Sequence, residues 1–357
     1  MKKRISLLLT FVLVLALLAG CAGTPVIYYS DCTCPAGSHN TPDVPDTPAV
    51  TDGAVKTGLY ITTSLDGTMN AAADANGQAK YDVTLVAVTV TDDGVIESCL
   101  IDSIPATVYF DASGAVVTEL MTDVQTKNEL GDAYGMVAYG GAKYEWNEQV
   151  AALARYAEGK TVEQLKSGAV NESGKAADAD LASVATIRIG GYVSAIEAAV
   201  ANARHLGAQA GDELRLATLA NVTNSVSATA EKNGTAQLDA DVTALTVNNG
   251  VITSCVIDSL QAKVEFDAAG AVTTDLTAAV QTKNELGEGY GMKAWGGAKF
   301  EWNEQAASFA AYVTGKTAAE VAGIAVNETA KPTDADLSAS VTISVGGFQA
   351  LIAKAMQ

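Results

Sequence analysis

One 25-residue segment of the chain occurs twice. Gln125–Gln149 reads QTKNELGDAYGMVAYGGAKYEWNEQ, and Gln281–Gln305 reads QTKNELGEGYGMKAWGGAKFEWNEQ. Twenty of the 25 positions are identical, and the offset of 156 residues holds from Gly94 and Gly250 to the last helical pattern. Self-similarity at a fixed offset is typical of duplicated structural units. The sequence therefore predicts two copies of one domain.

The positions of the two repeats divide the 357-residue chain into five segments. The two copies are expected at 57–203 and 212–357, with a linker at 204–211. Residues 21–56 contain five of the seven prolines together with Thr, Asp, Gly and Ser, so they are expected to form a flexible tether. Residues 1–20 have the charge and hydropathy pattern of a signal peptide and are left out of the fold argument.

The N-terminus predicts the compartment. Lys2, Lys3 and Arg4 precede an apolar run that is too short for a comfortable membrane span. The run ends in Leu18-Ala-Gly-Cys21, which resembles the lipobox of bacterial lipoproteins. The resemblance implies cleavage before Cys21, a lipid on that cysteine and anchoring at the extracytoplasmic face of the cell membrane. The alternative is an ordinary secretory signal that ends in Cys.

Composition excludes several classes of function. The formal net charge is −19, so phosphate backbones are repelled and nucleic acid is not an expected partner. The only histidines are His39 and His205, and both lie outside the repeats. Ser-His-Asp and Cys-His catalysis and His-rich metal sites are therefore excluded, and no metal is expected.

The pattern along each copy predicts an α+β fold, an antiparallel β meander packed with helices. In the first copy, strands are expected at 81–91, 95–102 and 106–110, because β-branched and alternating residues are separated by Asp-Gly turns. Helical spacing follows, with an apolar stripe at Trp146, Val150, Leu153 and Ala157 that the second copy repeats. Gly159 and Gly315 are expected in the left-handed conformation that ends this helix. Capping boxes beginning at Thr161 and Thr317 predict a second helix, and short β segments are expected at 186–189 and 342–345 before a last helix.

Four cysteines remain besides Cys21. Cys99 and Cys255 occupy equivalent positions inside strand patterns, and we expect two small buried hydrophobes rather than a disulfide. Cys32 and Cys34 lie in the tether and lack the spacing of a zinc site. They are a redox pair, an interchain link or incidental.

Paired carboxylates have two interpretations each. Glu145 and Glu148, like their counterparts in the second copy, could serve a hydrolase, but a solvated helix face is favoured. Asp178 and Asp180, with Asp334 and Asp336, could chelate calcium, but a turn or a helix cap is favoured because the other calcium ligands are missing.

The shared block carries the candidate binding residues. It combines aromatic rings, cations and Gly-Gly pairs, a combination that suits a flat anionic ligand. Trp146 and Trp302 lie on the helical stripe and are expected in the core, whereas Tyr139 and Trp295 are flanked by Gly-Gly and are equally consistent with ligand contact. The remaining candidates of the block are Tyr134, Tyr290, Lys127 and Lys283.

Each copy resembles the FMN-binding domain family of bacterial membrane-associated electron-transfer proteins. The resemblance rests on the β meander and on Leu337-Ser-Ala-Ser-Val-Thr342 before the last helix, where the family has Ser-Gly-Ala-Thr-x-Thr. It implies FMN esterified to Thr342, with Ser340 in the motif, and to Thr186 in the first copy, with Arg188 near the phosphate. The motif glycine is absent from both copies.

Two hypotheses follow, and neither requires a catalyst. The first is a lipid-anchored FMN-binding protein that transfers electrons at the cell surface, with the flavin supplying the redox chemistry. The alternative is a surface lipoprotein on the same fold that has lost flavin and binds a small molecule, a glycan or a protein partner.

Overall fold

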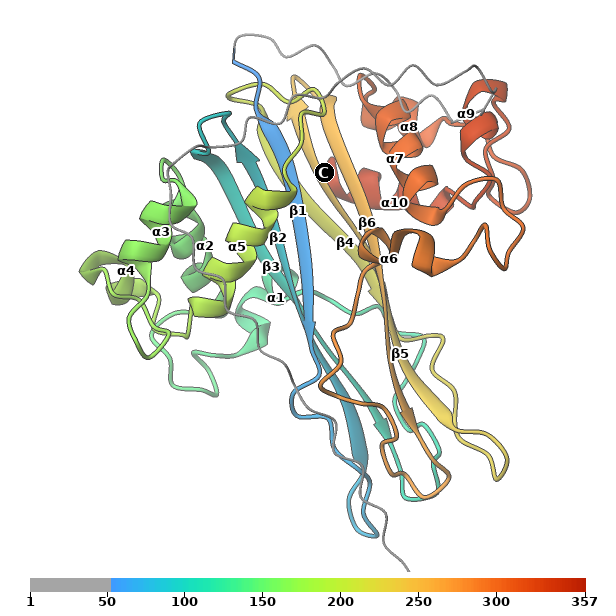
Figure 1. Ribbon diagram of the computed structural model, residues 1–357. Helices are drawn as coiled ribbons and strands as arrows, with labels where there is room; N and C mark the ends of the chain where they lie inside the picture. The colour runs from blue at the N-terminus through green and yellow to red at the C-terminus, as the bar shows by residue number, and fades with distance from the viewer. Residues whose placement is uncertain (1–52) are drawn as a thin grey trace, which may run out of the picture. The chain divides into compact units, whose positions relative to one another are not determined.

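The computed structural model describes residues 53–357 (Figure 1). The signal peptide, Cys21, Cys32, Cys34 and most of the tether lie outside the described residues. Among the helices of residues 53–357, none is both long and apolar enough to cross a membrane.

The fold is α+β, as predicted. Each copy contains a three-stranded antiparallel sheet packed with helices, and the strand orders are β1-β2-β3 and β4-β5-β6 (Figure 1). The strands are β1 Lys56–Ser64, β2 Gly77–Val90, β3 Ile96–Phe110, β4 Glu213–Asn221, β5 Gly234–Asn248 and β6 Val251–Phe266.

The helices follow the strands in each copy. In the first copy they are α1 Lys127–Leu130, η1 Gly131–Tyr134, α2 Trp146–Ala157, α3 Val162–Ala169, α4 Ala179–Val184 and α5 Gly190–Asn202. In the second copy they are α6 Lys283–Leu286, η2 Gly287–Tyr290, α7 Trp302–Val313, α8 Ala318–Ala322, α9 Ala335–Ser340 and α10 Gly346–Ala355.

Each sheet is buried on both faces. Successive side chains of a strand point to opposite faces. In β2, Tyr81, Val83 and Leu85 contribute to a core shared with the second copy, whereas Val86 and Val88 pack with the helices of the first copy. β2 therefore has a continuous run of apolar residues, whereas a strand buried on one face only would alternate apolar with polar residues.

The two copies belong to one unit of the chain and share this core. The rings of Phe110 and Phe266 stack with centroids 4.0 Å apart and planes 3° from parallel. Tyr81 donates a hydrogen bond of 2.8 Å to the carbonyl of Ala236, and burial raises the pKa of its hydroxyl. Because Gly77 and Gly234 each face one of the stacked rings, a Cβ at either position would lie within 2.6 Å of a ring carbon.

The predicted helical stripe is confirmed. Trp146, Val150, Leu153 and Ala157 are all buried on one face of α2. The capping boxes at Thr161 and Thr317 are present, and Gly159 and Gly315 have φ of 77° and 85°.

The structure corrects the predicted strands. The two strands expected at 95–102 and 106–110 form the single strand β3, which runs through Pro105. Proline is tolerated there because β3 is an edge strand. The strand β1 was not predicted, since its pattern lies next to the tether.

The β segments expected at 186–189 and 342–345 are absent as strands. Arg188 forms only an isolated bridge with Lys175, and the second segment forms no bridge. The reason lies in a side chain: Gln149 Oε1 accepts the backbone N–H groups of Thr186 and Ile187 at 2.8 and 3.1 Å. These donors therefore need no neighbouring strand.

Candidate functional site

The repeated block begins with a capped turn that docks on β3. Thr126 and Glu129 form a capping box around α1. The backbone N–H of Asn128 donates to Asp102 Oδ1 at 3.1 Å, and its side-chain amide donates to the carbonyl of Ile101 at 2.9 Å. Burial raises the pKa of Asp102 to about 6, against the hydrogen bonds that lower it. The same contacts recur in the second copy, so this part of the block fixes the fold of the chain.

Lys127, a predicted ligand-binding cation, lies inside the protein. Its ammonium is 5.3 Å from the ring centroid of Tyr134, 5.0 Å from that of Trp146 and 3.0 Å from Asp82 Oδ1. Burial is the largest single influence and opposes the charge, but the interactions with Asp82, Tyr192 and Tyr134 together outweigh it, so the pKa of Lys127 is raised. The side chain is only 5% exposed. Lys127 therefore holds two rings and a strand together and has no free face for a ligand.

The second copy keeps the rings but not the ion pair. Lys283 lies 5.2 Å from the ring centroid of Tyr290 and 4.9 Å from that of Trp302. No carboxylate among residues 53–357 lies within 4.0 Å of its ammonium. Asp239, which replaces Asp82 in register, accepts instead from the side-chain amide of Gln237 at 2.7 Å.

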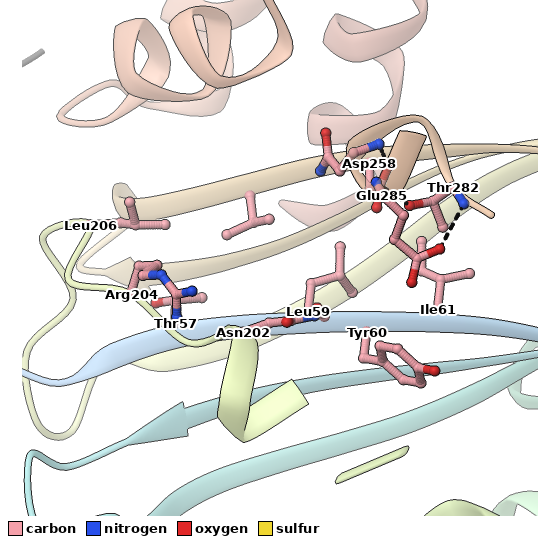
Figure 2. Close-up of a pocket in the computed structure, with 12 residues that line it drawn as sticks. Thr57, Leu59, Tyr60, Ile61, Asn202, Arg204, Leu206, Asp258, Thr282 and Glu285 are labelled. Atoms are coloured by element: carbon pink, nitrogen blue, oxygen red, sulfur yellow. Dashed lines mark hydrogen bonds between the residues drawn. The ribbon is translucent and has the colours of Figure 1, made fainter. Parts of the chain in front are cut away.

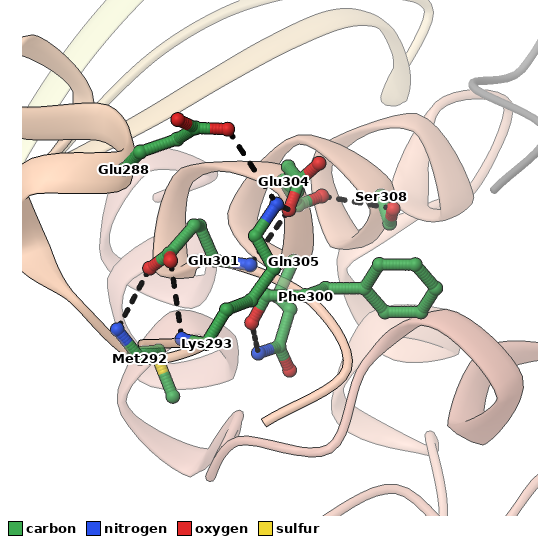
Figure 3. A network of polar contacts seen from close by, with 8 residues as sticks. All are labelled: Glu288, Met292, Lys293, Phe300, Glu301, Glu304, Gln305 and Ser308. Carbon is green, nitrogen blue, oxygen red and sulfur yellow. Dashed lines mark hydrogen bonds and ion pairs between the residues drawn. The ribbon is translucent and has the colours of Figure 1, made fainter. Parts of the chain in front are cut away.

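A buried glutamate fixes the loop that follows. Glu145 accepts the backbone N–H groups of Met136 and Val137, both at 2.9 Å. Figure 3 shows the second copy, where Glu301 accepts from Met292 at 2.8 Å and from Lys293 at 3.1 Å. The expectation of a solvated helix face is therefore wrong for Glu145 and Glu301, which are 4% and 2% exposed. Each buried carboxylate accepts two backbone N–H groups, and these hydrogen bonds offset the cost of burying its charge.

The loop presents an exposed ring. Tyr139 is 91% exposed and Trp295 is 83% exposed. Each ring lies against a glycine, because a Cβ on Gly291 would be 2.2 Å from the Trp295 ring and one on Gly135 would be 2.5 Å from the Tyr139 ring. These glycines have a φ of 82°, which side chains rarely adopt. We call Gly135–Tyr139 and Gly291–Trp295 the aromatic loops.

The core prediction for the other two tryptophans is confirmed. Trp146 and Trp302 are 3% and 6% exposed. Trp146 donates from its indole to the hydroxyl of Tyr192 at 3.1 Å, and Trp302 packs edge-on against Phe348. Trp295 is therefore the only exposed tryptophan of the three in the chain.

The threonines implicated by the flavin resemblance reach the surface. Thr186 and Thr342 are exposed, and each donates from Oγ1 to a glutamine Oε1 at 3.1 Å, Gln149 and Gln305 respectively. Ser340 donates to the carbonyl of Leu337 at 3.4 Å. Neither threonine lines either of the cavities described below. Both hydroxyls are accessible for a phosphoester bond. Neither of the two cavities provides a hollow for the flavin ring beside these threonines.

The remaining predicted groups have structural roles. Asp178 caps α4 by accepting the N–H groups of Asp180 and Leu181, both at 3.0 Å, and Asp334 caps α9 in the same way. Cys99 and Cys255 are buried free thiols, as expected, and burial raises the pKa of both to about 12. In residues 53–357, no cluster of three or more His, Cys, Asp or Glu side chains is suited to hold a metal ion.

A groove that no sequence pattern indicated lies where the two copies meet. It has a volume of about 370 Å³ and lies between β1 of the first copy and β6 and α6 of the second (Figure 2). Leu59, Ile61 and Val256 form apolar walls, and the ionisable groups of the lining are Arg204, Asp258 and Glu285. A second, more open hollow of about 470 Å³ lies between 72–76 and 111–113.

Comparisons with protein-family models, with curated protein sequences and with solved structures give no match for this chain.

Proposed function

We propose that this protein is a surface-anchored binding protein whose aromatic loops contact a ligand with a flat, largely apolar face, such as a sugar ring. The observation that carries the proposal is the exposure of Tyr139 and Trp295 in loops held by buried glutamates. A large ring in water loses the favourable free energy of burial, so a ligand that covers it would gain that free energy.

The loops are pre-organised for such contact. Two backbone hydrogen bonds to Glu301, together with the contact between Trp295 and Gly291, limit the freedom that the ring must lose on binding. Both copies keep an aromatic residue at this position although its identity changes. Two weak sites on one chain give higher avidity toward a repeating ligand than either site alone.

The test uses the spectroscopic isolation of Trp295. Because Trp146 and Trp302 are buried, quenching by acrylamide and its protection by ligand report on Trp295. We expect glycans that bind on an array to protect Trp295, and we expect Trp295→Ala to weaken array binding at least tenfold. Tyr139→Ala should weaken binding further. Wild-type binding to no glycan, or unchanged binding by the double variant, would contradict the proposal.

The lipid anchor belongs to the same proposal. Leu18-Ala-Gly-Cys21 supports acylation of Cys21 and placement at the extracytoplasmic face of the membrane. Cys21→Ser should release the protein from membranes or leave it as the uncleaved precursor. Incorporation of labelled fatty acid by this variant would show that the anchor lies elsewhere.

Flavin carriage with electron transfer to a redox partner is the second candidate, favoured by the exposed hydroxyl of Thr342. Coexpression with a flavin transferase should add one FMN mass at Thr342 before any at Thr186, because Ala339 and Ser340 retain part of the family motif. Thr342→Ala should remove that addition, and Thr342→Ser should restore it in part. Colourless, unmodified protein under these conditions would contradict flavin carriage, and ligand binding would remain as the candidate function.

A further inference from the structure

The Glu285 end of the groove has an equivalent position, its counterpart, where α1 of the first copy meets β4 and α10 of the second, and the two positions differ in one charge. In the counterpart, Glu129 of the first copy forms an ion pair with Lys354 at the end of α10. The ammonium of Lys354 also donates to the carbonyl of Thr218 on β4 at 2.7 Å. A carboxylate and an outward-facing strand carbonyl thus bind one ammonium group.

The repeat relates each of these residues to a residue at the groove. Glu285 is equivalent to Glu129 at an offset of 156, and both complete the capping box of the same helix. Ile61 is equivalent to Thr218 because their partners occupy matching positions of the two sheets. Ile61 pairs with Leu85, and Thr218 pairs with Val242. Ile61 and Glu285 both line the groove.

The equivalent of Lys354 is Ala198, which carries no charge. Glu285 accepts the backbone N–H of Thr282 through one oxygen, at 2.9 Å, and no ion pair to it is present among residues 53–357. The edge strand β1 also directs carbonyls outward, since Leu59 accepts the side-chain amide of Asn202 at 3.1 Å. The groove therefore keeps the two acceptors and lacks the ammonium that its counterpart holds.

We propose that this groove binds a ligand bearing a single alkyl-ammonium group, with the ammonium between the Glu285 carboxylate and the Ile61 carbonyl and the alkyl chain along Leu59 and Val256. Figure 2 shows Glu285 and Tyr60 at one end of the lining and Arg204 at the other.

The charges of the groove restrict the ligand. The cation at Arg204 disfavours a second positive charge at the far end of the ligand, so a monoamine or an amine with a distal carboxylate is preferred over a diamine. The net charge of −19 draws cations toward the protein. The volume of about 370 Å³ is suited to a small molecule or to one side chain.

The chemistry is shared by a free amine and by the lysine side chain of a partner protein. Isothermal titration of the full-length protein with n-pentylamine and with Nα-acetyl-lysine amide distinguishes these sources. We expect pentylamine to bind with a stoichiometry of one, and 1-pentanol to bind at least tenfold more weakly because it lacks the charge. Tighter binding of the lysine derivative than of pentylamine identifies a protein side chain as the occupant.

Three variants test the site. Glu285→Gln should weaken pentylamine binding at least tenfold, whereas Glu129→Gln, its matched control, should leave it unchanged. Ala198→Lys should abolish binding by supplying the ammonium from the chain itself. Lys354→Ala should raise the stoichiometry from one to two by opening the counterpart. Thermal unfolding shows whether each variant is folded.

Several results would overturn the proposal. These are no binding of pentylamine at millimolar concentration, equal affinity for pentylamine and pentanol, and full binding by folded Ala198→Lys. A stoichiometry that stays at one in folded Lys354→Ala would contradict the equivalence on which the proposal rests. The site does not depend on the aromatic loops, so Trp295→Ala should leave amine binding unchanged.

Discussion

Replacing Lys127 by Met should destabilise the protein by about 2–3 kcal/mol. Each cation–ring contact of a largely desolvated ammonium contributes about 1 kcal/mol, and Lys127 makes one with Tyr134 and one with Trp146. The ion pair adds about 0.5 kcal/mol, because the side chain of Asp82 is 47% exposed. Methionine has a similar volume, so the change removes the charge without opening a cavity.

The second copy provides the matched control. Lys283 makes the same two ring contacts without an ion pair, and it is less buried than Lys127. Lys283→Met should therefore cost about 1–2 kcal/mol, and the difference between the variants combines the ion pair with Asp82 and the deeper burial of Lys127. The double variant Lys127→Met/Asp82→Asn should lose little more than Lys127→Met alone, because the two residues act on each other.

The assay is urea unfolding followed by circular dichroism, with the free energy of unfolding compared at unchanged m-value. A competing effect works in the opposite direction, because replacing a buried charge by an apolar side chain removes its desolvation penalty. An equally stable or more stable Lys127→Met variant would show that this penalty outweighs the ring contacts. It would refute the reasoning that the ammonium stabilises the block.

Four further predictions concern residues of the second copy. Trp302→Ala should cost about 3–5 kcal/mol in urea unfolding, because it empties a buried site, whereas Trp295→Ala should change stability by less than about 0.5 kcal/mol; equal losses would make both rings structural. Gly291→Ala should be destabilising by about 1 kcal/mol or more and should increase the acrylamide quenching of Trp295, because the new Cβ displaces the ring; unchanged quenching would show that the glycine does not position it. Burial raises the pKa of Asp258 to about 6, so the native state holds this proton more tightly than the unfolded chain. Its contribution to stability is therefore fully present below about pH 4 and is lost as the pH rises through about 6. Urea midpoints at pH 4.5 and pH 7 should differ less in Asp258→Asn than in the wild type, and an equal difference would assign the pH dependence to other groups. Glu301→Gln should loosen the second aromatic loop, with faster amide exchange at the two N–H groups that it accepts; unchanged exchange would place the restraint elsewhere.

Local patterns predicted much of the fold correctly. The helical stripe that begins at Trp146 and the capping box at Thr161 depend on residues a few positions apart, and both are present as expected. The strand expected at 186–189 failed because its donors are taken by Gln149, which lies 37 residues away in the sequence. A pattern confined to a few neighbouring residues contains no information about such a distant acceptor.

Repeat identity and periodicity are read directly along the chain, so they were enough to predict the duplication, the α+β class of each copy and the core positions of Trp146 and Trp302. The burial of Lys127 between two rings, the exposure of Trp295 and the groove between β1 and α6 depend on contacts between distant segments and are seen only in the folded chain. The sequence around an aromatic residue beside two glycines is the same whether the ring faces water or the core, so it does not predict the exposure of the ring. Likewise, Lys354 forms its ion pair with Glu129 only because the folded chain brings α10 of the second copy to α1 of the first.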